Sequence, residues 1–212
     1  MDPQITRLVP TSTPAATTPT TPAGLAELTG ALARAAHAPA VLVVVDPALE
    51  DGALAHGSHC DPDAHITLGA DLLADQTRLR GVLAHEIAHH ALGHSQGLTQ
   101  ASWWQNVCWI GICTFVAAIV ADSSAWADVA LVVAIGAHLL AAREQRREEY
   151  QADAHSMQLL NAAGLDGHAI VTATLAALPQ ESRLYRLAGW IIGSHPTPDA
   201  RRRAFLATAQ AR

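Results

Sequence analysis

The spacing of apolar positions predicts one helix and several strands in the first third of the chain. From residue 25 to about 37, apolar residues recur at helical spacing, and Pro39 ends that helix. The β-branched run VLVVV at 41–45 predicts a buried strand, and the alternating AHITL at 64–68 predicts a half-buried one. The stretch between them is rich in Gly, Pro and Asp, which predicts loop with a short strand near 53–55.

Helices dominate the predicted elements of the remaining chain. A long helix is predicted over roughly 75–94, where Gly93 indicates its end. Its apolar positions are Leu79, Val82, Leu83, Ile87 and Leu92. Further on, a new, charged helix is expected from 143 to about 163 and another over 166–178. Residues 194–203 are expected to form a loop that enters a final helix.

Two apolar blocks separate these groups of helices. Residues 103–121 and 125–142 are each close to the roughly 20 residues that cross a bilayer core. Tryptophans lie near the block ends, as at a membrane interface, at positions 103, 104, 109 and 126. Arginines follow the second block directly, at positions 143, 146 and 147. The pattern predicts a transmembrane hairpin over 103–142 with both ends facing the cytoplasm. The alternative is a pair of buried helices in a soluble domain, but a 22.3 kDa chain has little room for them.

Together these elements predict a mainly α fold with a small β-sheet and an inserted apolar helical hairpin. Residues 1–23 are rich in Pro and Thr without any period, so a disordered arm is expected there. Residues 24–212 are expected to form one domain, which the hairpin 103–142 interrupts.

Charge and cysteine content narrow the classes of function. The formal net charge is −6 and no basic stripe is visible, so nucleic-acid binding has no electrostatic support. The three cysteines include no CxxC pair, which favours a reducing compartment over a disulfide framework. The 12 histidines are many for this length and make a metal site worth seeking.

The strongest chemical signal is the HEIAH sequence at 85–89. On a helix, His85 and His89 share one face, so both imidazoles can reach one Zn²⁺ ion. Glu86 then lies close enough to handle a water on that metal. The strand predicted at 64–68 would border a substrate cleft and pair with an extended peptide. The simpler interpretation is a surface helix that happens to carry two histidines.

A catalytic zinc requires a third protein ligand and one open position. In metzincins this ligand is a His ten residues after the first His of the motif. A Gly lies seven residues after that same first His. Here those positions hold Ser95 and Leu92, and His94 is one residue short. The metzincin pattern is therefore a poor match.

The better candidate for the third ligand is Glu149. It shares a helix face with Asp153, which could accept a hydrogen bond from a ligand imidazole. Glu148 is a rival ligand, although its side chain projects about 100° away from that of Glu149. A solvated acidic helix face is the alternative interpretation of this patch.

Three motifs in order along the chain resemble the M48 family of zinc metallopeptidases. They are HEIAH at 85–89, the R-x-x-E-x-x-A-D arrangement over 146–153, and His195-Pro196 followed by Arg201. The resemblance covers roughly residues 40–205, and the apolar hairpin lies where membrane-bound members carry membrane segments. It implies an α+β, zincin-like fold with an HExxH active-site helix and short edge strands.

The resemblance also implies a role for each matching residue. One zinc ion would be bound by His85, His89 and Glu149. Glu86 would be the general base, and His195 would lie near the cleft and stabilise the developing oxyanion. Asp153 would support a ligand from outside the metal shell, and Arg201 would brace the loop of His195.

The sequence thus predicts a zinc-dependent metalloendopeptidase that cleaves protein or peptide substrates by a zinc-activated water. A lipid bilayer is the second expected partner, and the expected location is a bacterial cell membrane with the catalytic part facing the cytoplasm. One alternative is a membrane-anchored, non-catalytic scaffold whose metal site is closed by His195 or His94. Another is a different class of HExxH peptidase, which would usually place its acidic ligand closer to the HExxH helix.

Overall fold

The chain is described from a computed structural model, which covers residues 21–49, 52–56, 64–94, 103–179 and 195–210. The predicted disordered arm at 1–23 lies almost entirely outside these residues. By its contacts the chain divides into two compact units. The first comprises Met1–Gln96, Tyr150–Gln180 and Pro198–Arg212, and the second comprises Gly97–Glu149 and Glu181–Thr197.

The first unit contains a three-stranded sheet in the order β1-β3-β2. Strand β3 (His65–Gly69) lies in the middle, parallel to β1 (Leu42–Asp46) and antiparallel to β2 (Ala53–His56). The three strands match the predicted ones. The predicted substrate-pairing role of 64–68 is wrong, however, because β1 and β2 occupy both backbone edges of β3. Two short 3₁₀ turns, Pro47–Leu49 and Ala70–Ala74, follow β1 and β3.

Helix α1 (Pro22–Ala35) is the first helix of this unit and packs against α2. It begins three residues earlier than predicted because the Thr21 side chain accepts a hydrogen bond from the Gly24 backbone N–H at 3.1 Å. Pro22 at the first helical position has no N–H to leave unsatisfied.

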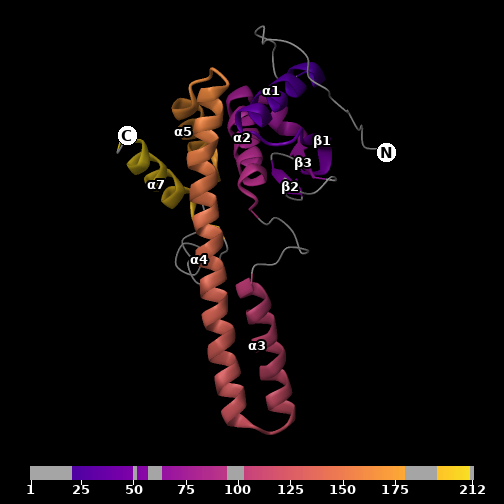
Figure 1. Cartoon of the computed structure of the whole chain (residues 1–212), viewed down its shortest axis with the longest axis vertical. Helices are drawn as coiled ribbons and strands as arrows, with labels where there is room; N and C mark the ends of the chain where they lie inside the picture. Colours follow the sequence, from indigo (N-terminus) through magenta and orange to yellow (C-terminus); the bar gives the residue numbers. More distant parts are fainter. Residues whose placement is uncertain (1–20, 50–51, 57–63, 95–102, 180–194, 211–212) are drawn as a thin grey trace. The chain divides into compact units, whose positions relative to one another are not determined.

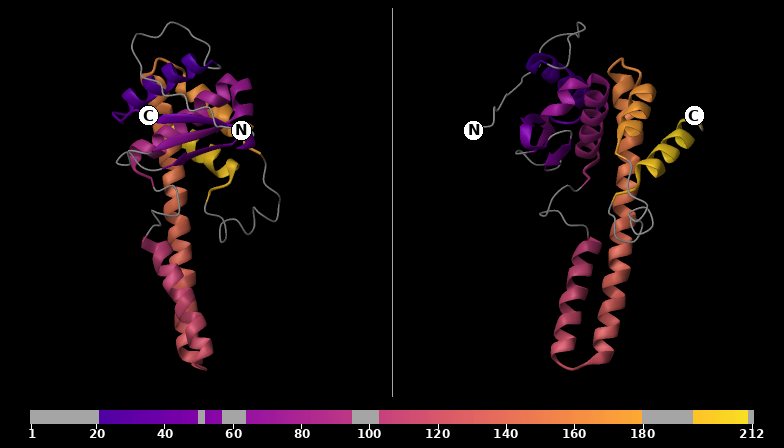
Figure 2. Two further views of the ribbon diagram at one scale, coloured as in Figure 1. Left: turned by 90° about the vertical axis from the view of Figure 1, so that its right-hand side faces the viewer. Right: turned by 180° about the vertical axis from the view of Figure 1, so that it is seen from behind.

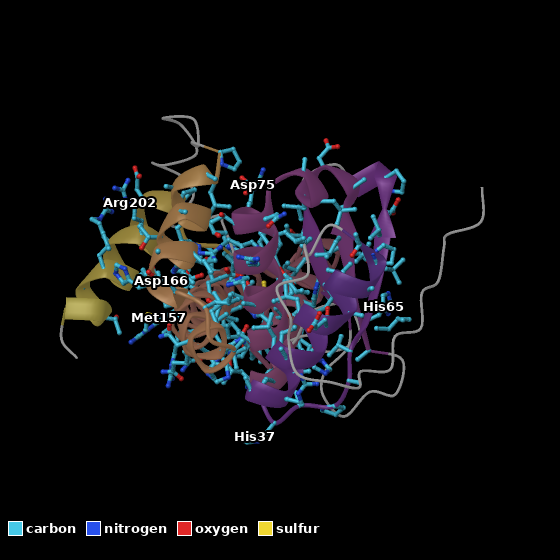
Figure 3. All side chains as sticks on the ribbon, turned by 90° about the horizontal axis from the view of Figure 1, so that it is seen from above. His37, His65, Asp75, Met157, Asp166 and Arg202 are labelled. Carbon is cyan, nitrogen blue, oxygen red and sulfur yellow. The ribbon has the colours of Figure 1, made fainter. Side chains whose placement is uncertain are left out.

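Helix α2 (Gln76–Leu92) lies between the sheet and α5 (Gly167–Ala177), as Figure 1 shows. Its N-terminus is capped by Asp75, which accepts hydrogen bonds from the backbone N–H groups of Thr77 and Arg78. Asp166 caps α5 in the same way, and Figure 3 labels both aspartates. These caps fix the two helix starts close to the predicted ones.

The core of the first unit fills the space between the sheet and these helices. Its fully buried side chains include Leu32, Ile66, Leu68, Leu72, Leu79, Leu83, Ile87, Leu159 and Leu160. Gly81 allows close packing of α2 on α5, because a Cβ at that position would collide with the side chain of Thr174. The last helix, α7 (Pro198–Gln210), packs against α5.

The second unit contains α3 (Trp103–Val120) and the first part of α4 (Ser124–Ala162), which run side by side as a hairpin in Figures 1 and 2. Both apolar blocks are helical, as predicted. The separate helix expected from 143 is wrong, since α4 continues without a break into the first unit. No Pro or Gly interrupts 137–162, and residues such as Ala, Leu, Glu and Arg favour the helix throughout.

The hairpin helices meet through small side chains. A Cβ at Gly111 of α3 would lie 3.0 Å from the Cβ of Ala134 on α4. The buried residues of α4 in this hairpin are all alanines, at positions 127, 130, 134, 137, 141 and 142. Within the described residues, α3 and α4 are the two helices long and apolar enough to cross a membrane, by length and composition alone.

Candidate metal centre

Helix α2 presents His85 and His89 to the same point. Because they lie one turn apart, their Nε2 atoms are 3.0 Å from each other. Tetrahedral zinc bonds of about 2.0–2.1 Å would place two ligand nitrogens roughly 3.4 Å apart, so a small adjustment fits both rings to one ion. Glu86 follows His85 directly and is buried, with 8% of its surface exposed.

Glu149 completes a group of three side chains that could hold a metal ion. One ligand atom from each of His85, His89 and Glu149 lies within 4.8 Å of the others, and the described residues offer no second such group. Glu149 is the last residue of the segment Gly97–Glu149 of the second unit, and its helix α4 continues into the first unit from Tyr150. Two imidazoles and one carboxylate are a donor set that suits zinc and leaves a fourth position. The residues present therefore fit the expected ion.

Asp153 lies one turn beyond Glu149 on α4. It contacts Nδ1 of His85, the ring nitrogen other than the Nε2 that faces His89. Its Oδ1 is 3.1 Å from His85 Nδ1. The guanidinium of Arg201 on α7 donates two hydrogen bonds to the same carboxylate. They run from Nε to Oδ2 at 2.9 Å and from Nη2 to Oδ1 at 2.6 Å. Such a paired, planar contact fixes the carboxylate that in turn orients the imidazole.

The charge state of Asp153 follows from these neighbours. Burial by itself raises the pKa of this carboxyl group, but the hydrogen bonds and positive charge from His85 and Arg201 outweigh it. The pKa of Asp153 is therefore held below its ordinary value. The group is an anion that accepts a hydrogen bond from the imidazole of His85.

The neighbouring Glu148 has a different environment. Burial first, and then repulsion from Glu144 and Glu149, raises its pKa above the ordinary value. Glu148 is absent from the group of three metal-ligating residues. Of the two glutamates, Glu149 is therefore the one that can share a metal ion with His85 and His89.

His195 contacts the carboxylate of Glu149. Its Nδ1 lies 3.0 Å from Glu149 Oε1, and 70% of the His195 side chain is exposed. The resemblance placed His195 near the cleft as an oxyanion stabiliser and Arg201 as a brace for its loop. The structure places the Arg201 guanidinium on Asp153 and His85. The roles expected for His195 at the oxyanion and for Arg201 at its loop stay predictions.

One neighbour of the metal-ligating group was left without a role by the sequence. His94, the second residue after the end of α2, has its Nδ1 at 3.0 Å from Nδ1 of His89. The signal in the sequence was Gly93, because a glycine that ends a helix turns the next residue back over the last helical turn.

Comparison with known families agrees with this geometry. The model of the family described as Peptidase family M48 matches residues 20–209. The chain belongs to peptidase family M48, a family of zinc metallopeptidases. Another class of HExxH peptidase is thereby set aside. Searches among curated proteins and among solved structures gave no match.

Proposed function

We propose that this chain is a zinc-dependent metalloendopeptidase that hydrolyses peptide bonds in proteins or peptides with a water molecule. The observation that carries the proposal is the convergence of His85, His89 and Glu149, with Glu86 buried beside them, in a chain of the M48 family. A Zn²⁺ ion held by this set would supply a water of pKa about 7 and an electrophile that polarises the peptide carbonyl.

Glu86 is the general base in this proposal. Its carboxylate takes the proton of the attacking water and later donates that proton to the leaving amine. A positioned base of this kind typically contributes about 10²–10⁴-fold to the rate. Its place next to His85 on the largely buried helix α2 supports the assignment.

The residues around the ligands have positioning roles. Asp153 keeps the proton of His85 on Nδ1, and Arg201 holds Asp153 in place. His195 positions the Glu149 carboxylate through the contact of its Nδ1 with Oε1. The proposal also keeps the expected contact of His195 with the oxyanion of the reacting carbonyl.

The sheet edge that we expect to take the substrate is β2. Among the described strands, β2 pairs only with β3, so its other backbone edge is open to an extended peptide. β2 also packs against α2, which carries the catalytic residues.

We assign the lipid bilayer as the surroundings of the hairpin 103–142. Only 11% of the apolar window of α3 and 33% of that of α4 are buried, whereas the core helices of a soluble domain are mostly buried. Arg143 and Arg147 are exposed directly after the apolar part of α4. By the tendency of arginine to remain on the cytoplasmic side, the catalytic residues would face the cytoplasm.

Cleavage of an unfolded protein tests the proposed activity. The full chain is expected to cut casein with zinc present, to stop when a chelator removes the metal, and to resume when zinc is returned. Glu86→Gln should bind zinc as the wild type does and cleave at least about 100-fold more slowly. Wild-type rates from Glu86→Gln would show that Glu86 is not the base. Stoichiometric zinc without any cleavage would favour the non-catalytic scaffold.

A further inference from the structure

The end of α2 is built by a glycine that turns the chain back on the helix. Gly93 has a φ of 68°, in the left-handed region where a side chain would be strained. Two backbone hydrogen bonds close the turn, from Gly93 N–H to His90 O at 3.2 Å and from His94 N–H to His89 O at 3.0 Å. This bonding pattern brings the residue after the glycine onto the residue five positions earlier.

That earlier residue is His89, one of the three metal-ligating side chains. At helix ends of this type the returning residue frequently makes an apolar contact. Here it is an imidazole, with ring centroids 4.9 Å apart and Nδ1 of His94 3.0 Å from Nδ1 of His89. Both rings are buried, with 3% of His89 and 8% of His94 exposed. The contact between His94 and His89 is therefore polar, at a position of the helix end where an apolar contact is frequent.

The two nitrogens of His89 face opposite partners. Nε2 faces Nε2 of His85, and Nδ1 faces His94. A neutral imidazole carries one proton, so a proton on Nδ1 leaves the Nε2 lone pair available for a metal. His94 can hold this tautomer if it accepts the Nδ1–H hydrogen bond with its own Nδ1.

We propose that Gly93 and His94 form the positioning device of the second histidine ligand. His94 fixes the tautomer and ring orientation of His89, as Asp153 and Arg201 fix those of His85. The inference rests on the proposed zinc site and adds a residue to it. Each of the two histidine ligands then has its own hydrogen-bond partner outside the metal shell. For His85 it is the Asp153 carboxylate, which Arg201 binds, and for His89 it is the His94 imidazole, which the turn at Gly93 positions.

Two substitutions separate a positioning role from simple packing. His94→Leu keeps an apolar contact at the helix end and removes the acceptor, whereas His94→Asn keeps an acceptor near the position of Nδ1. His155→Leu is the matched control, because His155 lines the same hollow of about 310 Å³ as His94 but contacts Gln158. The full chain in detergent is titrated with zinc against a competing chelator, and its cobalt form is examined by visible absorption.

We expect His94→Leu to weaken zinc binding by about 10–100-fold and to alter the cobalt spectrum, with the metal-free unfolding temperature unchanged. His94→Asn should recover zinc affinity to within a few-fold of wild type, and His155→Leu should match wild type. Unchanged zinc affinity in His94→Leu would overturn the inference, as would equal losses in the Leu and Asn variants. Failure of the wild type itself to bind zinc would instead overturn the proposed function.

Discussion

The two units of this chain bury opposite kinds of side chain. The first unit fully buries large apolar residues, such as Leu32, Ile66 and Ile87, each with 0% exposed. In the hairpin the buried residues are small, and the large apolar ones are outside. Val120 is 82% exposed and Val132 is 71% exposed.

This difference is the one that two different solvents would produce, in line with the lipid environment proposed for the hairpin. Water drives large apolar side chains inward, at roughly 25 cal/mol per Å² buried. In lipid that force between helices is absent, and small residues at the contact let the backbones approach closely. The contact between Gly111 and Ala134 is such a close approach through small residues. The comparison predicts that substitutions at the proposed ligands and their partners change metal binding and catalysis, whereas substitutions within the hairpin 103–142 change membrane insertion.

The largest expected effect concerns the ligand that α4 contributes. Glu149→Ala should weaken zinc binding by more than about 100-fold, beyond the range that loss of an outer partner gives, and should abolish cleavage. Glu148→Ala is the control, and it should retain near wild-type zinc content by elemental analysis. If the Glu148 variant lost its zinc and the Glu149 variant kept it, the assignment of the carboxylate ligand would be reversed.

A similar effect is expected for a charge in the middle of the hairpin. Val132→Arg should disfavour insertion by about 2.5–3.5 kcal/mol, the cost of arginine at the centre of a membrane helix. The measurement is the fraction of protein that stays in membranes after alkaline carbonate extraction. Ala176→Arg, at an exposed position of α5 in the first unit, should leave that fraction unchanged. Release of the wild type itself by carbonate would contradict the lipid environment.

A smaller effect is expected from the partner of His85. Asp153→Asn leaves Arg201 without its anionic partner and removes the negative charge next to the imidazole. We expect about 10–100-fold weaker zinc binding with membrane retention unchanged, measured by chelator competition. Equal zinc affinity in the variant would show that Asp153 only stabilises the fold.

The smallest effect compares two helical glycines. Gly81→Ala should destabilise the first unit by about 1–3 kcal/mol, because the new methyl group overpacks against Thr174. Gly136→Ala in the hairpin meets nothing within 4 Å and should be neutral or slightly stabilising. Thermal unfolding of both variants gives the comparison. Equal unfolding temperatures would mean that the close packing of α2 on α5 relaxes freely.

Local signals in the sequence were sufficient for most elements and for the helix faces that carry the candidate ligands. The caps at Asp75 and Gly93 bound α2, and helical spacing placed Glu149 and Asp153 on one face. These features depend on residues within a few turns of each other. That is why periodicity and capping rules could find them.

What the sequence missed depends on contacts between distant segments. The central position of β3 follows from pairing with two other strands, which the alternation within 64–68 does not encode. The contact of Arg201 with Asp153 joins residues 48 positions apart. The unbroken α4 was missed because a change from apolar to charged composition was interpreted as a helix boundary, although no helix-breaking residue lies there.

Anomalous diffraction at the zinc edge on zinc-loaded crystals tests the central claim most directly. The account predicts one ion bound by Nε2 of His85, Nε2 of His89 and a Glu149 oxygen, each at about 2.0–2.2 Å, with a fourth position not filled by protein. An ion without Glu149 among its ligands would contradict the account. So would a site whose fourth position is occupied by a protein side chain such as His195 or His94.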